Sequence, residues 1–318
     1  MSATLLEGAP IADRIKEDVK AAVAEIGRVP KLAAILATDN KGAEFYAKSQ
    51  GKACEEVGIE FELHQLAADA SQADIETKIA ELNDNVAVTA IILLMPVPAG
   101  VDGRALQRAI DPKKDVDGVN PVNIGGVVQG STTLAPCTAQ AVLALVEASG
   151  VPLFTDPKEA QGKGTEVVVV GHSEIVGKPS GLLLLDKFCT VTVCHIGTQD
   201  LKAHTTKADV LVVAVGVPGL VKGEHIKPGA TVVDVGINRV KTDDGKSKIV
   251  GDVLFDEAAE IAGQITPVPG GVGTVTTAML LKNIIDAARL QGHRSPGPLK
   301  FPGNLGQSAP CGRRVKLQ

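Results

Sequence analysis

The stretch that most constrains the fold is Glu166 to Gly181, which reads EVVVVGHSEIVGKPSG. Four consecutive valines predict a strand that is buried on both faces, as in a parallel sheet. The segment from Gly171 to Gly177 predicts a tight turn that opens onto an apolar helix near Gly181. Such a turn aims backbone N–H groups and the positive end of a helix at one point, which favours a phosphate group. The glycine spacing is not Gly-x-Gly-x-x-Gly, so an ordinary strand-to-helix turn is the alternative.

Strand patterns and helix patterns alternate along the rest of the chain. From Ile11 to Ile26, apolar residues recur at intervals of three and four, which predicts an amphipathic helix. Apolar runs predict strands at 31–37, 59–63, 88–94, 167–170, 191–194, 210–213 and 231–234, and further helices are predicted at 43–57, 71–82, 102–110, 139–149 and 275–290. This alternation predicts an α/β fold of two domains, in which ligands bind at the carboxyl ends of parallel strands. Residues 150–164 are rich in Pro, Gly and charge and are interpreted as the linker between the domains.

Glycine-bearing turns follow three strands of the second predicted domain. They are the turns at Gly171–Gly177, Val215–Gly219 and Asp234–Asn238. In a doubly wound sheet all three lie on the same edge, an arrangement that suits a dinucleotide. The Pro- and Gly-rich segment 266–274 comes just before the last helix and is either a binding loop of fixed shape or a rigid connector.

A charged loop at 111–118 offers a second candidate site near the ends of the first strands. Asp117 stands before a glycine, so it is either a plain turn residue or part of a pair of carboxylates that binds a nitrogen-rich ligand.

Composition argues against several other classes of protein. The 318 residues carry a net charge of −5, which gives no reason to expect nucleic acid or an anionic membrane as a partner. The five cysteines form no C-x-x-C pair, as expected for a reduced, cytosolic protein, and the six histidines have no metal-ligand spacing. We find no secretion signal and no apolar run of about 18 residues, and we predict a disordered basic tail at 292–318.

Several motifs in combination resemble one family, the bifunctional methylenetetrahydrofolate dehydrogenase/cyclohydrolases. They occur in the family's order over roughly residues 4–290. The matching stretches are Tyr46 with GKACEEVG (51–58), MPVP (95–98), KDVDG (114–118) with NPVN (120–123), PCT (136–138), GHSEIVGKP (171–179), DVGIN (234–238), GDV (251–253) and TPVPGGVG (266–273).

The resemblance implies a catalytic domain of residues 1–149 together with 275–291, and a Rossmann-type NAD(P)-binding domain of residues 150–274. It also implies a cytoplasmic homodimer with folate in the cleft between the domains. There a hydride passes from the methylene bridge of the folate to the nicotinamide, and the methenyl product is then hydrolysed.

The resemblance also implies roles for individual residues, whereas the spacing of the histidines gives no reason to expect a metal. The catalytic set is Tyr46, Gln50 and Asp117. The folate-binding set is Tyr46, Leu94, Pro96, Asp117, Pro269, Gly270 and Gly271. The dinucleotide-binding set is Gly171, His172, Ser173, Ile175, Val176, His195, Gly216, Val217, Pro218, Gly236, Ile237, Asn238, Gly273 and Thr274.

Two positions depart from the family pattern. Gln50 occupies the place of the family's catalytic lysine, four residues after Tyr46, and Leu94 replaces a glutamine expected near that lysine. A lysine can change its protonation state, whereas an amide only exchanges hydrogen bonds. We therefore expect a dehydrogenase whose cyclohydrolase activity is weak or lost. The alternatives are a dehydrogenase for a modified pterin such as methylenetetrahydromethanopterin, and a folate- or nucleotide-binding protein without turnover.

The choice between NADP and NAD depends on two histidines. His172 stands where some family members have an arginine for the 2′-phosphate, and His195 follows the strand where an NAD-selective acid would be expected. Two histidines and no carboxylate favour NADP, with NAD as the alternative. Each histidine can also be read as an ordinary exposed turn residue.

Overall fold

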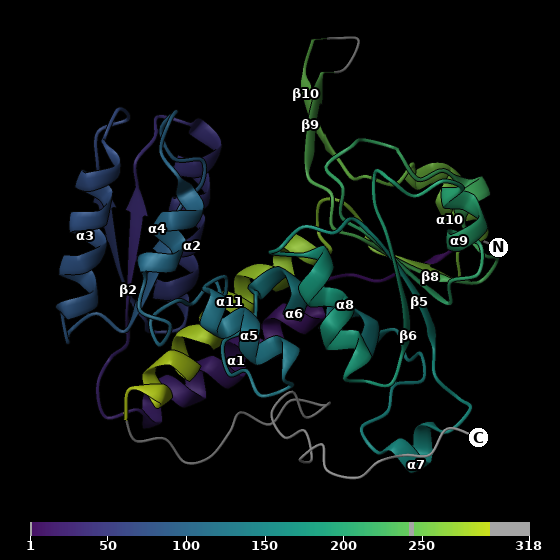
Figure 1. Ribbon diagram of the computed structural model, residues 1–318, viewed down its shortest axis with the longest axis horizontal. Coiled ribbons are helices and arrows are strands. Elements are labelled where there is room, and N and C mark those ends of the chain that lie inside the picture. Colours follow the sequence, from purple (N-terminus) through teal and green to yellow (C-terminus); the bar gives the residue numbers. More distant parts are fainter. Residues whose placement is uncertain (1, 242–244, 293–318) are drawn as a thin grey trace.

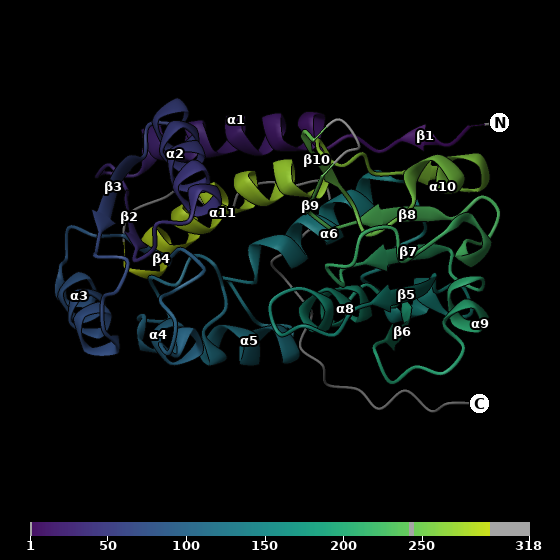
Figure 2. The ribbon, with the colours of Figure 1, turned by 90° about the horizontal axis from the view of Figure 1, so that it is seen from above.

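Two parallel sheets occupy opposite ends of the molecule, and long helices run between them (Figures 1 and 2). The computed structural model describes residues 2–241 and 245–292. In Figure 1 the smaller sheet lies on the left and the larger on the right, where a two-stranded hairpin projects upward. The predicted two-domain α/β fold is confirmed. All but the first residue of the predicted tail 292–318 lies outside the described residues.

The smaller sheet has three parallel strands in the order β3-β2-β4. Its strands and helices are β2 (Lys31–Leu36), α2 (Lys41–Glu56), β3 (Glu60–Gln65), α3 (Gln72–Asp84), β4 (Ala90–Leu93) and α4 (Gly103–Ala109). Alternate residues of β2 belong to different buried clusters: Leu32 clusters with residues of α2, and Ala33 with residues of α3. Because β3 and β4 flank β2 on opposite sides, the carboxyl ends of β2 and β4 form a switch point, where α/β proteins bind ligands.

The larger sheet has six parallel strands in the order β1-β11-β8-β7-β5-β6. The strands are β1 (Thr4–Leu5), β5 (Glu166–Val170), β6 (Thr190–Cys194), β7 (Val210–Val213), β8 (Thr231–Asp234) and β11 (Gln264–Ile265). Its helices are α7 (Pro157–Ala160), α8 (Gly177–Leu185), α9 (Leu201–Thr205), the 3-10 turn η1 (Gly223–His225) and α10 (Phe255–Ile261). Val167 and Val169 belong to one buried cluster and Val168 and Val170 to another, as predicted for a strand buried on both faces. The second switch point lies between β5 and β7.

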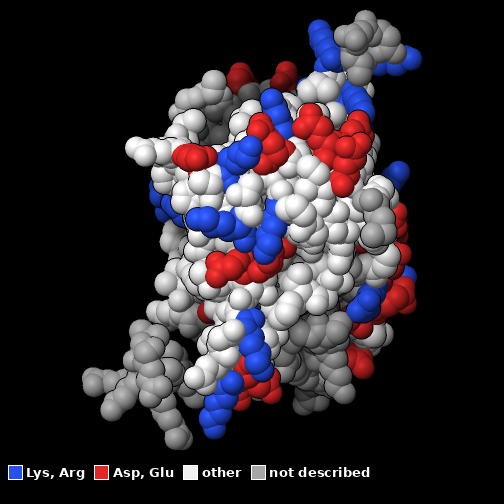
Figure 3. All heavy atoms as spheres, turned by 90° about the vertical axis from the view of Figure 1, so that its right-hand side faces the viewer, with Lys and Arg blue, Asp and Glu red and all other residues white. Residues whose placement is uncertain are grey.

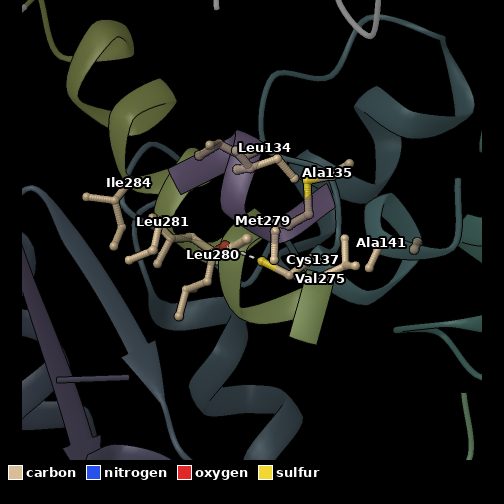
Figure 4. Close-up of a cluster of buried hydrophobic side chains, with 14 of the residues drawn as sticks. Leu134, Ala135, Cys137, Ala141, Val275, Met279, Leu280, Leu281 and Ile284 are labelled. Atoms are coloured by element: carbon tan, nitrogen blue, oxygen red, sulfur yellow. Dashed lines mark hydrogen bonds between the residues drawn. The ribbon is translucent and has the colours of Figure 1, made fainter. Parts of the chain in front are cut away.

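Four helices fill the space between the sheets: α1 (Ala9–Glu25), α5 (Pro121–Val128), α6 (Cys137–Ala148) and α11 (Val272–Leu290). Helix α11 is buried along most of its length and packs against both α1 and α6. Figure 4 shows side chains of α11, among them Met279 and Leu280, beside Cys137 at the start of α6. One continuous core thus contains residues from both sheets and from these helices.

The predicted elements differ from the structure mainly at their ends. The strands at 210–213 and 231–234 have the predicted bounds, but α8 begins at Gly177 rather than near Gly181. The reason is local: the Ser173 hydroxyl accepts the N–H groups of Val176 and Gly177, at 3.2 and 3.3 Å, and so holds the chain in a turn directly before α8. Several elements were not predicted, namely β1, α5, α7, α10, β11 and the hairpin of β9 (Asn238–Lys241) and β10 (Ser247–Val250).

Candidate active site

Helix α2 brings Tyr46 and Gln50 together, because residues four apart lie on the same helix face. Gln50 is only 1% exposed, and neither its Nε2 nor its Oε1 has a hydrogen-bond partner among the described residues. Tyr46 keeps 40% of its surface exposed. The burial of the rest of the side chain, and then the nearby Asp117 and Cys137, raise the pKa of Tyr46 to about 12. The Gln50 side chain opposes this shift in the tyrosine pKa, although it lies outside hydrogen-bonding geometry.

The two carboxylates of the charged loop have different roles. Asp115 is fully buried and accepts hydrogen bonds from the Asn120 N–H at 2.7 Å and from Asn123 Nδ2 at 2.8 Å, so it is a structural anchor. The Asp117 carboxylate, by contrast, accepts no hydrogen bond from the described residues. Burial, and then the charge of Asp115, raise the pKa of Asp117 to about 6. Asp117 is therefore the member of the pair that can bind a ligand.

Two buried residues that the sequence analysis did not single out hold this loop. Lys114 Nζ donates to the carbonyls of Leu82, Asn83 and Asn85 at 2.9, 2.7 and 2.9 Å, and so caps the carboxyl end of α3. Asn283 of α11 donates through Nδ2 to the Val116 carbonyl at 2.9 Å. The backbone on both sides of Asp115 is thus tied to distant helices, which fixes where Asp117 stands.

Leu94 follows β4 and is buried, at 2% exposure, in the same apolar cluster as Ala47 of α2. Pro96, two residues later, is exposed.

A buried lysine does lie in this region: Lys282 of α11 contributes to the electrostatic environment of Cys137. Its Nζ is 2.6 Å from the Asp286 carboxylate, so its charge is held in an ion pair.

The turn after β5 fits a phosphate group. A Cβ added to Gly171 would lie 2.1 Å from the Ala214 carbonyl oxygen, and one added to Gly177 would lie 2.1 Å from the Gly171 oxygen, so only glycine allows this fold of the turn. The backbone N–H groups of residues 172–175 find no acceptor in the described chain. They stand at the amino end of α8, where unpaired donors favour an anion.

His172 and His195 meet beside this turn. Their ring centroids are 5.0 Å apart and both side chains are exposed. His195 Nδ1 accepts the Gly197 N–H at 3.0 Å, so its Nε2 can donate to a ligand. Ile175 of the same turn is 50% exposed.

The turns after β7 and β8 are fastened by two buried carboxylates that the sequence analysis quoted in motifs without giving them a role. Asp252 accepts the N–H groups of Val215 and Gly216 and the Nδ2 of Asn238. Asp234 accepts the N–H groups of Gly236, Asp252 and Val253. Burial, which outweighs these hydrogen bonds, raises the pKa of Asp234 to about 6. Residues predicted to bind the dinucleotide at these turns, Gly216, Val217, Pro218 and Ile237, are exposed or border the cleft.

A cavity of about 480 Å³ lies between α1, α2 and the loop that precedes α11. Of the predicted residues, it is lined by Gly236, Ile237, Pro269, Gly270, Gly271, Gly273 and Thr274. Its other wall carries polar residues that the sequence analysis missed, including Ser49 and Lys52 of α2 and Lys16, which pairs with Glu56 at 2.8 Å. These residues belong to ordinary amphipathic helices, and no sequence signal separates them from solvated helix faces.

In the described ranges, no helix is long and apolar enough to cross a membrane, and no group of three His, Cys, Asp or Glu side chains is placed to hold a metal. On the right-hand face of the molecule, acidic and basic side chains are interspersed (Figure 3).

Comparison with known proteins gives consistent matches along the chain. Residues 6–117 match the family model "Tetrahydrofolate dehydrogenase/cyclohydrolase, catalytic domain", and residues 136–292 match the NAD(P)-binding domain of the same name. The bifunctional protein FolD of Moorella thermoacetica is 44% identical over 91% of this chain and all of its own length, and that of Brevibacillus brevis is 42% identical over 92% and 99%.

Comparison with solved structures gives the same family. The bifunctional FolD dehydrogenase/cyclohydrolase of Campylobacter jejuni superposes with a TM-score of 0.84 at 37% identity, covering 91% of this chain and 100% of its own. The Trypanosoma brucei dehydrogenase-cyclohydrolase, solved with NADP cofactor and an inhibitor, gives a TM-score of 0.83 at 36% identity over 92% and 99%.

Proposed function

Because this chain belongs to the tetrahydrofolate dehydrogenase/cyclohydrolase family, we propose that it is an NADP-linked methylenetetrahydrofolate dehydrogenase whose cyclohydrolase activity is weak or absent. The observation that carries this proposal is Gln50. Among the described residues this buried amide has no partner in hydrogen-bonding geometry, and it stands where the family resemblance implies a lysine.

Hydride transfer is compatible with the residues present. When bound, the nicotinamide supplies the hydride acceptor, and the chain has to hold two carbons close and in line. The ionised Asp117 carboxylate would accept the adjacent N–H donors of the pterin edge. Tyr46, which a pKa of about 12 keeps neutral at physiological pH, would shape the folate pocket beside it. Neither task requires a side chain to carry a proton during the reaction.

Hydrolysis of the methenyl product is different, because water must be activated and charge must change at the reacting centre. The Gln50 amide cannot gain or lose a proton at neutral pH, and Leu94 offers no polar atom. With a pKa of about 12, the Tyr46 hydroxyl stays protonated at neutral pH and offers no phenolate to act as a base, and Lys282 is paired with Asp286. The methenyl compound would therefore leave the site unhydrolysed and be consumed by a separate hydrolase.

The preference for NADP is supported by the histidine pair. His172 and His195 can both donate to a 2′-phosphate, and β6 ends in Cys194 rather than in an acid that would repel it. The relative from Trypanosoma brucei was solved with NADP. On the family resemblance we also propose the domain boundaries stated above and a cytoplasmic homodimer.

The decisive variant is Gln50→Lys. With methenyltetrahydrofolate supplied directly, we expect the wild type to hydrolyse it little above the buffer rate and Gln50→Lys to hydrolyse it at least about tenfold faster, a gain equivalent to one charged interaction. The matched control is Ser49→Lys, which adds the same charge one residue away, on the cavity side of α2. Equal hydrolysis by wild type and Gln50→Lys would remove the basis of the proposal.

A further inference from the structure

We propose that Asp252 is a positioning residue of the dinucleotide site, which holds the turns after β7 and β8 together and sets the orientation of the Asn238 amide. The inference rests on the proposed function only for the nucleotide that the site takes, and it requires no turnover of folate.

The contacts of Asp252 come from two separate turns. The side chain is fully buried, at 0% exposure. Its Oδ2 accepts the N–H groups of Val215 and Gly216 at 2.7 and 2.8 Å, and its Oδ1 accepts Asn238 Nδ2 at 2.8 Å. One carboxylate thus joins the turn after β7 to the turn after β8, and both turns carry predicted dinucleotide-binding residues.

The backbone around Asp252 is packed so closely that these contacts cannot shift. A Cβ on Gly236 would lie 2.4 Å from both the N and the Oδ1 of Asp252, and a Cβ on Gly251 would lie 1.8 Å from Asp234 Oδ2. The backbone of Asp252 is also bound on both sides, because its N–H donates to Asp234 and its carbonyl accepts the Val221 N–H at 3.1 Å. The position of the carboxylate therefore dictates the position of both turns.

The chemistry of a carboxylate also fixes which end of Asn238 faces it. An ionised Asp side chain only accepts hydrogen bonds, so the Asn238 NH₂ group must point toward Asp252. Asn238 Oδ1 accepts nothing from the described residues and is left for a donor on the ligand. A nicotinamide carboxamide and the ribose hydroxyls are such donors.

The variant Asp252→Asn tests this directly. The two N–H groups of the first turn need an acceptor, so the new amide would keep its oxygen there and turn its NH₂ toward Asn238. Asn238 would then have to rotate, presenting NH₂ instead of oxygen to the ligand. We expect the Kd for NADPH, measured by its fluorescence without folate, to rise about tenfold, while the Kd for methylenetetrahydrofolate, measured without nucleotide, changes less than about twofold.

The exchanged pair Asp252→Asn with Asn238→Asp provides the rescue. Here the NH₂ of residue 252 donates to a carboxylate at 238, and an oxygen again faces the ligand. We expect this double variant to fold and to bind NADPH within about threefold of wild type. The double variant also tests the inference if the single variant does not fold. The matched control is Asp209→Asn, which should leave the Kd unchanged. Asp209 stands at the amino end of β7, away from the carboxyl ends of the strands, and its carboxylate binds Lys227 and the Glu166 N–H.

Three results would overturn the inference. They are a folded Asp252→Asn protein with wild-type affinity for NADPH, a parallel loss of NADPH and folate affinity together with thermal stability, and an exchanged pair that folds but does not regain affinity. Because the readout is nucleotide binding, an inactive wild type that binds NADPH would refute the proposed dehydrogenase function while leaving this inference intact.

Discussion

At the scale of single residues, the site is defined by which polar groups lack partners. Gln50 is buried, and neither end of its amide has a hydrogen-bond partner among the described residues. The Asp117 side chain is half-buried, and its carboxylate accepts no hydrogen bond from the same part of the chain. A buried polar group without a partner is costly, so each one in a native protein requires an explanation, such as a catalytic role or a bound water or ion. A pterin with adjacent N–H donors and a reactive bridge would complete both.

The raised pKa of Asp117 predicts how folate use depends on pH. Below a pKa of about 6 the carboxyl is protonated and loses much of its power to accept two N–H donors, so kcat/KM for methylenetetrahydrofolate should fall as the pH drops through this value. Initial rates between about pH 5 and 8 test this. In Asp117→Asn the dependence should flatten and kcat/KM at neutral pH should fall at least about a hundredfold. A wild-type profile that is flat near pH 6 would show that Asp117 does not bind the substrate.

A permanent cation at position 172 should strengthen the choice of NADP. In His172→Arg, a guanidinium would replace an imidazole beside His195 and could bind a 2′-phosphate with two hydrogen bonds. The KM for NADP should fall about tenfold while that for NAD stays the same. If the KM for NADP and the KM for NAD changed by the same factor, the 2′-phosphate would not bind at residue 172.

At the scale of elements, the loop at 114–118 depends on contacts with helices far away in the chain. Replacing Lys114 by Met removes three hydrogen bonds to carbonyls at the end of α3, one of them 32 residues away. We expect the free energy of unfolding to fall by about 2–3 kcal/mol and the KM for folate to rise, with NADPH affinity unchanged. Urea denaturation and binding measurements check this against Lys113→Met, whose side chain is exposed. A variant that keeps wild-type stability and folate KM would contradict this role of Lys114.

Local sequence patterns were enough to predict the strands and most helices, but not the hydrogen bonds that join distant parts of the chain. The four valines of β5 mark a strand whatever surrounds it, and the glycine turns follow from that. Helix α5 was missed because Gly125 and Gly126 weaken its helical pattern, although Asn120 caps it and Pro121 begins it. The roles of Lys114 and Asp252 depend on partners up to 32 and 37 residues away, and nothing in their immediate sequence reveals them. Likewise, Gln50 was recognisable as a departure, but its lack of partners is visible only in three dimensions.

At the scale of the whole molecule, α11 joins the two sheets through one core. Leu281 is fully buried on this helix, in the cluster that also contains residues of β2 and β5. Leu281→Ala should lower the free energy of unfolding by about 3 kcal/mol. Because the core is shared, fluorescence of the only tyrosine, Tyr46, and far-UV circular dichroism should shift together in urea. Two separate transitions would show that the sheets unfold independently.

Under the proposed function, this protein oxidises methylenetetrahydrofolate but does not go on to hydrolyse the product. The most direct measurement is a progress curve of the wild type with methylenetetrahydrofolate and NADP, recording NADPH and methenyltetrahydrofolate at separate wavelengths in one cuvette. We expect the two products to rise together in equal amounts and the methenyl compound then to decay only at its rate in buffer. NADPH formation without accumulation of the methenyl compound would show that hydrolysis keeps pace with oxidation and that Gln50 has not removed the second activity.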